Sequence, residues 1–170
     1  MKLKVTGLKE TIAWLNKQKE SIPDKRKEFF ERLAEIGIET ATLKFSESIY
    51  DGDNDVVVKP YTWQGDKLII EAEGKSVLFI EFGSGITYSS PAHPLAEDYG
   101  YDRGGYGYHL GEFGSWRYKG EPGTNGIVIG AGKHKGEVFT AGNPANMAMY
   151  QAEQDMRQRI ADIAREVFRF

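Results

Sequence analysis

The spacing of the apolar residues changes along this chain, and these changes constrain its fold more than any other feature of the sequence. Leu8, Ile12 and Leu15 recur at helical spacing, which predicts a first helix of about three turns. Ser21-Ile22-Pro23 indicates a break and a restart, because proline is well tolerated in the first turn of a helix. The helical pattern then continues, so residues 8–49 are expected to form helices, the second of them long.

The second helix carries one apolar stripe. Its members advance by four, three, four and three residues: Phe29, Leu33, Ile36, Thr40 and Leu43. At the other end of the chain, Asn143 is a good N-cap and Pro144 suits the first helical position, which predicts a helix over residues 144–169. The buried stripe of that helix is expected to consist of Met149, Met156, Ile160, Ile163, Val167 and Phe170.

Between the helices the pattern changes to short runs of β-branched and aromatic residues separated by glycine-containing turns. Val56–Trp63, Lys67–Glu73 and Ser76–Phe82 predict three antiparallel strands, so residues 55–83 are expected to form a β-meander. Within the third run, Val77–Ile80 is apolar on both alternations, which favours a strand covered on both faces. Residues 127–139 contain two further short strand candidates, Ile127–Ala131 and Glu137–Phe139.

Residues 84–126 are expected to form one long loop. With Gly83 at its start, the segment holds eleven of the 20 glycines and six of the nine tyrosines, and it has almost no regular period. A loop of this length is usually functional, disordered or ordered by a partner. The fold class predicted is α+β: a small antiparallel sheet packed against two long helices, with a Gly/Tyr-rich loop, in one domain spanning residues 1–170.

Composition excludes several classes of function. The chain has 22 basic and 25 acidic residues, so it lacks the basic footprint of a nucleic-acid binder, and no sequence-specific nucleic acid is expected as a partner. The absence of cysteine excludes disulfides and cysteine-based zinc sites. The N-terminus has no apolar stretch typical of a secretory signal, and no run is long enough to span a bilayer. We therefore expect a protein made and kept in the cytoplasm, without a membrane partner, unless a larger assembly carries it elsewhere.

Several fragments resemble catalytic motifs but lack required residues. Gly130–Gly136 lacks the first glycine and the Ser/Thr of a phosphate-binding loop. Phe82–Gly85 lacks the glycine that a nucleophile elbow needs two residues before its serine. The three histidines are widely spaced, which disfavours a metal site. No catalytic residue, cofactor or metal is therefore expected. Among the carboxylates Glu81 is the most unusual, and it is expected to be a partly buried acid paired with an arginine.

The Tyr/Gly-rich loop has two possible uses. Aromatic side chains such as Tyr106 and Trp116 can stack on sugars or bases. They are equally suited to protein interfaces, where tyrosine and tryptophan are enriched at the energetic centre. The net charge of −3 favours the protein interface over nucleic acid.

Three fragments together resemble a known family. Phe79-Ile80-Glu81-Phe82-Gly83-Ser84-Gly85 resembles the hydrophobic–Glu-Phe-Gly-Thr/Ser-Gly signature of the putative tail-component proteins of long-tailed siphophages. A His-Pro follows in that family, as His93-Pro94 does here. In the family an aromatic loop comes next and ends in a Gly-x-Pro entry to the last helix. Gly142–Ala152 is similar to that entry. The early helices and the hairpin are also placed as in the family, so the resemblance covers nearly the whole chain. This chain departs from the family in having more tyrosine in place of Gly-Trp pairs, and Met-Ala-Met-Tyr in place of a Phe-Met-Tyr entry.

The resemblance implies a structural virion protein of a tailed bacteriophage or prophage, at the head–tail junction, known as a neck, head–tail joining or tail-completion protein. It implies a non-enzymatic subunit that forms a homo-oligomeric ring, as a hexamer or dodecamer. The implied neighbours are other neck or connector proteins and tail tube or terminator proteins. The implied location is the virion, with assembly in the host cytoplasm.

We expect the contacts of such a subunit at the sheet edge near Phe79–Phe82 and in the Tyr/Gly-rich loop. The candidate interface residues are Glu81, Phe82, Tyr101, Tyr106, Tyr108, Trp116 and Tyr118. Two rival hypotheses remain. One is a tail-associated module that recognises a glycan through the Tyr/Trp loop, and the other is a hydrolase that uses Glu81 and His93.

Overall fold

Three helices and three small antiparallel sheets make up the part of the chain that the structure describes. The structure is a computed structural model, and it describes residues 8–50, 52–84, 92–101, 116–123 and 126–169. The helices are α1 (Leu8–Ser46), α2 (Val77–Phe82) and α3 (Ala148–Val167). The strands are β1 (Val57–Val58), β2 (Thr62–Gln64), β3 (Lys67–Ile69), β4 (Ala72–Glu73), β5 (Trp116–Tyr118), β6 (Ile127–Val128) and β7 (Val138–Thr140). The predicted α+β class is confirmed.

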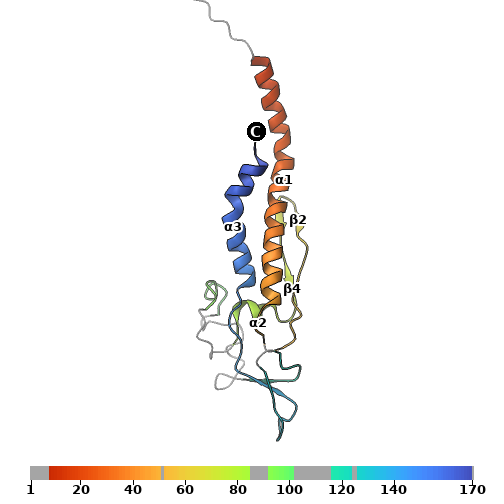
Figure 1. Cartoon of the computed structure of the whole chain (residues 1–170), viewed down its shortest axis with the longest axis vertical. Helices are drawn as coiled ribbons and strands as arrows, with labels where there is room; N and C mark the ends of the chain where they lie inside the picture. The colour runs from red at the N-terminus through yellow and green to blue at the C-terminus, as the bar shows by residue number, and fades with distance from the viewer. Residues whose placement is uncertain (1–7, 51, 85–91, 102–115, 124–125, 170) are drawn as a thin grey trace, which may run out of the picture.

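The molecule is elongated, as Figure 1 shows. Helix α3 lies beside the C-terminal half of α1, and the β1–β4 and β2–β3 pairs lie along the other side of α1. Helix α2 lies near the end of α1, and the three-stranded sheet, in the order β5-β7-β6, lies beyond it. The N-terminal half of α1 projects past the end of α3.

The predicted meander over residues 55–83 is wrong in its third strand. The first two runs do pair as antiparallel strands, each divided in two, because β1 pairs with β4 and β2 with β3. Val77–Phe82, in contrast, forms the short helix α2 with Ile80, Glu81 and Phe82 buried. A continuous apolar run of this length has no period that separates a buried strand from a buried helix.

Two other boundaries differ from the prediction. Strand β5 lies inside the segment predicted as loop and pairs with β7, where Arg117 faces Phe139. Helix α1 continues through Pro23 without the predicted break. A proline inside a helix lacks the N–H for one backbone hydrogen bond and crowds the preceding turn. Helix α1 nonetheless continues on both sides of Pro23.

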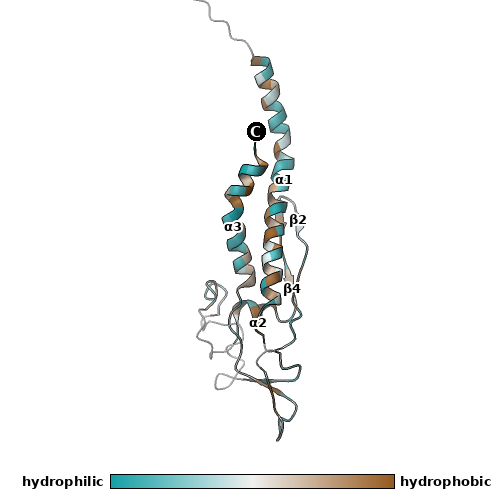
Figure 2. Cartoon of the chain, viewed as in Figure 1, coloured by the Kyte–Doolittle hydropathy of each residue, from teal (hydrophilic) through white to brown (hydrophobic). Residues whose placement is uncertain are grey.

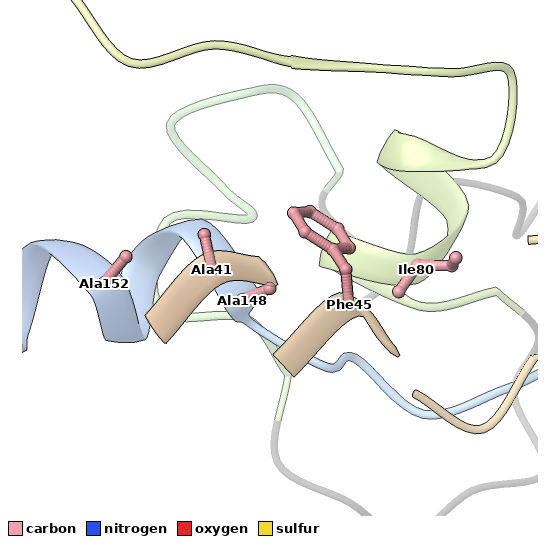
Figure 3. Close-up of a cluster of buried hydrophobic side chains, with 5 residues drawn as sticks. All are labelled: Ala41, Phe45, Ile80, Ala148 and Ala152. Atoms are coloured by element: carbon pink, nitrogen blue, oxygen red, sulfur yellow. The ribbon is translucent and has the colours of Figure 1, made fainter. Parts of the chain in front are cut away.

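The core lies where α1, α2 and α3 meet. Figure 3 shows the cluster of Ala41, Phe45, Ile80, Ala148 and Ala152. Small residues let the two long helices approach closely, since a Cβ added to Gly37 would lie 2.7 Å from the Met156 Sδ. A second cluster joins Leu33 of α1 to Ile163 and Val167 of α3.

The predicted apolar stripes match the buried faces only in part. On α1 the buried residues are Leu33, Ala34, Gly37, Ala41 and Phe45, whereas Leu43 of the predicted stripe is 52% exposed. On α3, Ile163 and Val167 are buried as predicted, Ile160 is exposed, and Phe170 lies outside the described residues. Alanine and glycine carry the close contacts here, and they do not stand out in an apolar pattern.

Asp55 holds the start of α2. Its carboxylate accepts hydrogen bonds from the backbone N–H groups of Lys75 (2.8 Å) and Ser76 (2.9 Å) and from the Ser76 hydroxyl (2.5 Å). The hydrogen bond from the Ser76 side chain, followed by those from the two backbone N–H groups, lowers the pKa of Asp55 to about 2. The folded state therefore prefers the ionised carboxylate.

This preference predicts a loss of stability in acid. Because the pKa of Asp55 is lower in the folded state than its ordinary value of 3.8, its contribution is complete above that value and disappears as the pH falls toward about 2. We expect a contribution on the order of 1 kcal/mol after allowing for solvent screening at an exposed carboxylate. Urea unfolding of the wild type and Asp55→Asn at pH 7 and at about pH 2.5, inside that window, measures this contribution. The difference in the free energy of unfolding between the two proteins should be smaller in acid than at pH 7. A difference that stays constant contradicts the lowered pKa of Asp55.

Candidate functional site

The two segments that carry the family resemblance lie against each other, although about 60 residues separate them. Ser84 and Asn143 exchange two backbone hydrogen bonds, Ser84 N to Asn143 O at 2.9 Å and Asn143 N to Ser84 O at 2.7 Å. The Ser84 hydroxyl also donates to Asn143 Oδ1, and Asn143 Nδ2 donates to the carbonyl oxygen of Phe79 at 2.9 Å. Asn143 is therefore not the predicted N-cap, and α3 begins at Ala148 rather than at residue 144.

Glu81 of α2 binds the start of α3. Its Oε2 accepts a hydrogen bond from the N–H of Met149 at 2.9 Å, and its Oε1 accepts one from the N–H of Tyr150 at 3.0 Å. Both N–H groups belong to the first turn of α3, where no carbonyl of the same helix is available to accept them. A negative charge at this end of a helix is also favoured by the helix dipole. Glu81 thus caps α3 from another helix, with 4% of its surface exposed.

His93 is the second polar partner of Glu81. Its Nε2 lies 3.1 Å from Glu81 Oε1, and its Nδ1 accepts a hydrogen bond from the N–H of Leu95 at 3.1 Å. A nitrogen that accepts a hydrogen bond carries no proton, so the neutral ring has its proton on Nε2 and donates it to Glu81. The prediction that Glu81 pairs with an arginine is therefore wrong.

Aromatic rings cover this buried pair. The ring of Phe82 packs against His93, with centroids 4.3 Å apart, and against Tyr101 at 4.8 Å. Tyr99 lies 5.4 Å from Phe82 and stacks on Tyr101, and Tyr150 packs against His93 from α3. Glu81 and His93 are each 4% exposed, and hydrogen bonds in such a buried setting are electrostatically stronger than in water.

The structure brings together three of the predicted site residues, Glu81, Phe82 and Tyr101, in one buried cluster. Tyr118 is elsewhere, in β5, and its hydroxyl donates to the carbonyl oxygen of Glu121 at 2.7 Å. Trp116 begins β5, and no position of its side chain is described. Tyr106 and Tyr108 lie outside the described residues.

Sequence reasoning missed the structural role of Ser84 and Asn143. Both are small polar residues in glycine-rich surroundings, which is typical of a turn and of a helix cap. Their actual partners are distant in the sequence. Only the joint appearance of both segments in the family pattern hinted that they belong together.

The cluster holds the Glu81 and His93 pair that a hydrolase would need, but each polar atom of the pair already has a partner inside the chain. Glu81 accepts three hydrogen bonds, and both ring nitrogens of His93 are engaged. A general base must be within reach of the substrate proton that it removes. The contacts therefore favour a structural use of this pair. In the described ranges no group of three acidic or histidine residues is placed to hold a metal ion, and no helix there is both long and apolar enough to cross a membrane.

Comparisons with protein-family models, with curated proteins and with solved structures gave no match to this chain. The resemblance to the phage tail-component family therefore stays a prediction that depends on the motifs alone.

Replacing Glu81 with glutamine tests its role as the cap of α3. The amide can accept through one oxygen only, and its NH2 group faces N–H donors, so at least one buried donor loses its partner. We expect Glu81→Gln to lower the free energy of unfolding by about 2–3 kcal/mol. Denaturant unfolding followed by circular dichroism measures the change. The matched control is Glu97→Gln at an exposed position, with an expected change below about 0.5 kcal/mol. Equal effects of the two substitutions would refute the capping role.

Gly83 permits the close contact between the two segments. Its backbone has φ 74° and ψ 172°, a region that is essentially restricted to glycine. A Cβ there would lie 2.6 Å from the backbone nitrogen of Ala145, which cannot move without shifting the entry to α3.

We expect Gly83→Ala to lower the free energy of unfolding by about 3 kcal/mol, from backbone strain and the clash together. Gly65 is the control, because it also has a positive φ of 64° but open space around it. Gly65→Ala should cost only about 1 kcal/mol. Equal melting temperatures of the two variants, measured side by side, would contradict the combined effect of backbone strain and the contact with Ala145 at Gly83.

Proposed function

We propose that this protein is a structural subunit of a tailed bacteriophage or prophage virion, and that it forms a ring at the head–tail connection. In this proposal two long helices, a small antiparallel sheet and the Gly/Tyr-rich loop form one subunit that neighbouring copies complete. Its partners are further copies of itself, in a hexamer or dodecamer, and neck, tail tube or terminator proteins on either side.

The observation that carries the proposal is the contact between the motif segments. The resemblance depends on residues 79–85, on His93-Pro94 and on residues 142–152. Glu81 touches His93 and the start of α3, and Ser84 pairs with Asn143. Fragments that matched a family by chance would have no reason to lie together. Their convergence supports the view that the motifs record one shared fold.

The surface supports self-association. The described sheets have two or three strands and leave backbone groups unpaired at their edges, which other chains can use. Large apolar side chains are exposed along the projecting half of α1. A monomer that works alone rarely exposes such a row, whereas a subunit of an assembly buries it against a neighbour.

A knockout tests the proposal directly. Deleting the gene from the phage or prophage that encodes it should yield filled heads and separate tails, because the connecting ring is missing. Electron microscopy and plaque titre measure the result, and complementation with the wild-type gene should restore joined particles. The control is complementation with the Glu97→Gln variant, which should restore them equally. Joined, infectious virions without the gene would overturn the proposal.

A further inference from the structure

A single stripe of residues runs along α1 from end to end. Its members advance by alternating steps of four and three residues: Leu8, Ile12, Leu15, Lys19, Ile22, Arg26, Phe29, Leu33, Ile36, Thr40 and Leu43. Alternating steps of four and three keep residues on one face of a helix and are typical of a surface that packs against another helix. The stripe keeps its phase through Pro23, where α1 also continues without a break.

Among the described residues, the C-terminal part of this stripe packs against α3, and Ile22 and Arg26 of the N-terminal part line a pocket with Trp63 of β2. Phe29, Leu33 and Ile36 pack against a cluster that includes Ile163 and Val167 of α3. The N-terminal part projects beyond α3, and Figure 2 shows hydrophobic residues on this half as well. Its four apolar residues are about half exposed: Leu8 61%, Ile12 49%, Leu15 53% and Ile22 45%. We call residues 8–26 of the stripe the α1 ridge.

The charges on the ridge are all positive. Lys19 and Arg26 occupy stripe positions themselves, and neither makes an ion pair with a residue that the structure describes. The acidic residues of this half, Glu10, Glu20 and Asp24, lie roughly 120° or more around the helix from the stripe. Two ridges packed on each other would bring Lys19 and Arg26 of both copies into one seam, and like charges there are repulsive. The ridge therefore fits an acidic surface rather than a second ridge.

Such a surface lies between α1 and α3. A groove of about 600 Å³ there is lined by five acidic and two arginine residues, together with Ile36, Thr40, Gln158 and Ile163. The acidic residues are Glu35, Glu39, Asp155, Asp162 and Glu166, and the arginines are Arg32 and Arg159. In the described part of the chain, Glu35 and Glu39 have no ion-pair partner, whereas Glu166 pairs with Arg32. Leu43 continues the groove face along α1, one turn beyond Glu39, and is exposed.

We propose that the α1 ridge of one subunit docks into the α1/α3 groove of a second copy of this chain. Leu15 and Ile22 would lie on Ile36 and Leu43, and Lys19 and Arg26 would pair with Glu35 and Glu39. A chain cannot make this contact with itself, because its ridge and its groove lie along one continuous helix. The contact joins two different surfaces, so each copy offers one free ridge and one free groove, and such contacts close into a ring when the rotation permits. This inference rests on the self-association contained in the proposed function, and it assigns the surfaces that carry it.

The contact is tested in the full-length chain by reversing the charges on each of the two surfaces. The ridge variant is Lys19→Glu with Arg26→Glu, and the groove variant is Glu35→Lys with Glu39→Lys. Sedimentation and light scattering over a concentration series measure assembly. Each variant alone should dissociate at least about tenfold more readily than the wild type, because attraction becomes repulsion. The controls Lys17→Glu and Glu97→Lys, away from both surfaces, should stay within about twofold of the wild type.

Mixing the two variants provides the decisive measurement. The reversed ridge of one then matches the reversed groove of the other, and the unchanged surfaces match as well, so assembly should return with the two variants alternating. Raised salt should weaken the wild-type assembly, since exposed charge pairs are screened. Circular dichroism and melting temperature confirm that each variant is folded.

Three results would overturn the interface. A groove variant that assembles like the wild type shows that the ridge does not use the groove. Mixed variants that fail to assemble show that the charges do not face each other. A wild-type chain that stays monomeric at every concentration shows that the contact does not form. Incorporation into virions is scored separately, so that loss of this interface and loss of the proposed function are distinguished.

Discussion

The buried carboxylate of Glu81 is the interaction on which the rest of this structure depends. Taking a carboxylate out of water is costly unless hydrogen bonds replace those of the solvent. Here two N–H groups at the start of α3 and the ring of His93 replace them. One side chain thereby joins α2, the segment after residue 91 and α3. The position of α3 along α1, and with it the core, follows from this contact.

The strained backbone just before α3 is held by contacts of the same region. Met147, the residue before α3, has a left-handed backbone with φ 59°, which is unfavourable for a side chain of this kind. Its N–H donates to the backbone carbonyl of Glu81 at 3.1 Å, and its own carbonyl accepts from Gln151 at 2.8 Å. Such a conformation persists only where its surroundings hold it. The cap and the Ser84–Asn143 bridge hold both ends of this turn, so α3 can begin abruptly after a glycine- and proline-containing loop.

The sequence predicted the α+β class, the helical nature of both ends and the first two strand pairs, because periodic patterns over many residues decide these features. It did not predict α2, because the apolar run Val77–Ile80 has no period that separates a buried strand from a buried helix. The predicted break at Pro23 follows from the local effect of proline, whereas the stripe from Ile22 to Phe29 keeps its helical phase across it. For the site, the sequence marks Glu81 as an unusual carboxylate but does not reveal its partners. A backbone N–H has no signature in the sequence, and His93 is distant from α3 in the chain.

The continuity of α1 through Pro23 would also matter for the proposed assembly. A helix broken there would leave residues 8–22 on a hinge, and the ordering of that segment on binding would oppose any contact it made. As a continuous helix, α1 holds its ridge in a fixed direction relative to the groove beside α3. Fixed geometry between two complementary surfaces sets the rotation from one copy to the next, and a constant rotation is what allows a ring to close. The same 39-residue helix packs against α3 in the core, and in the proposed assembly it would also set the direction in which the next subunit attaches.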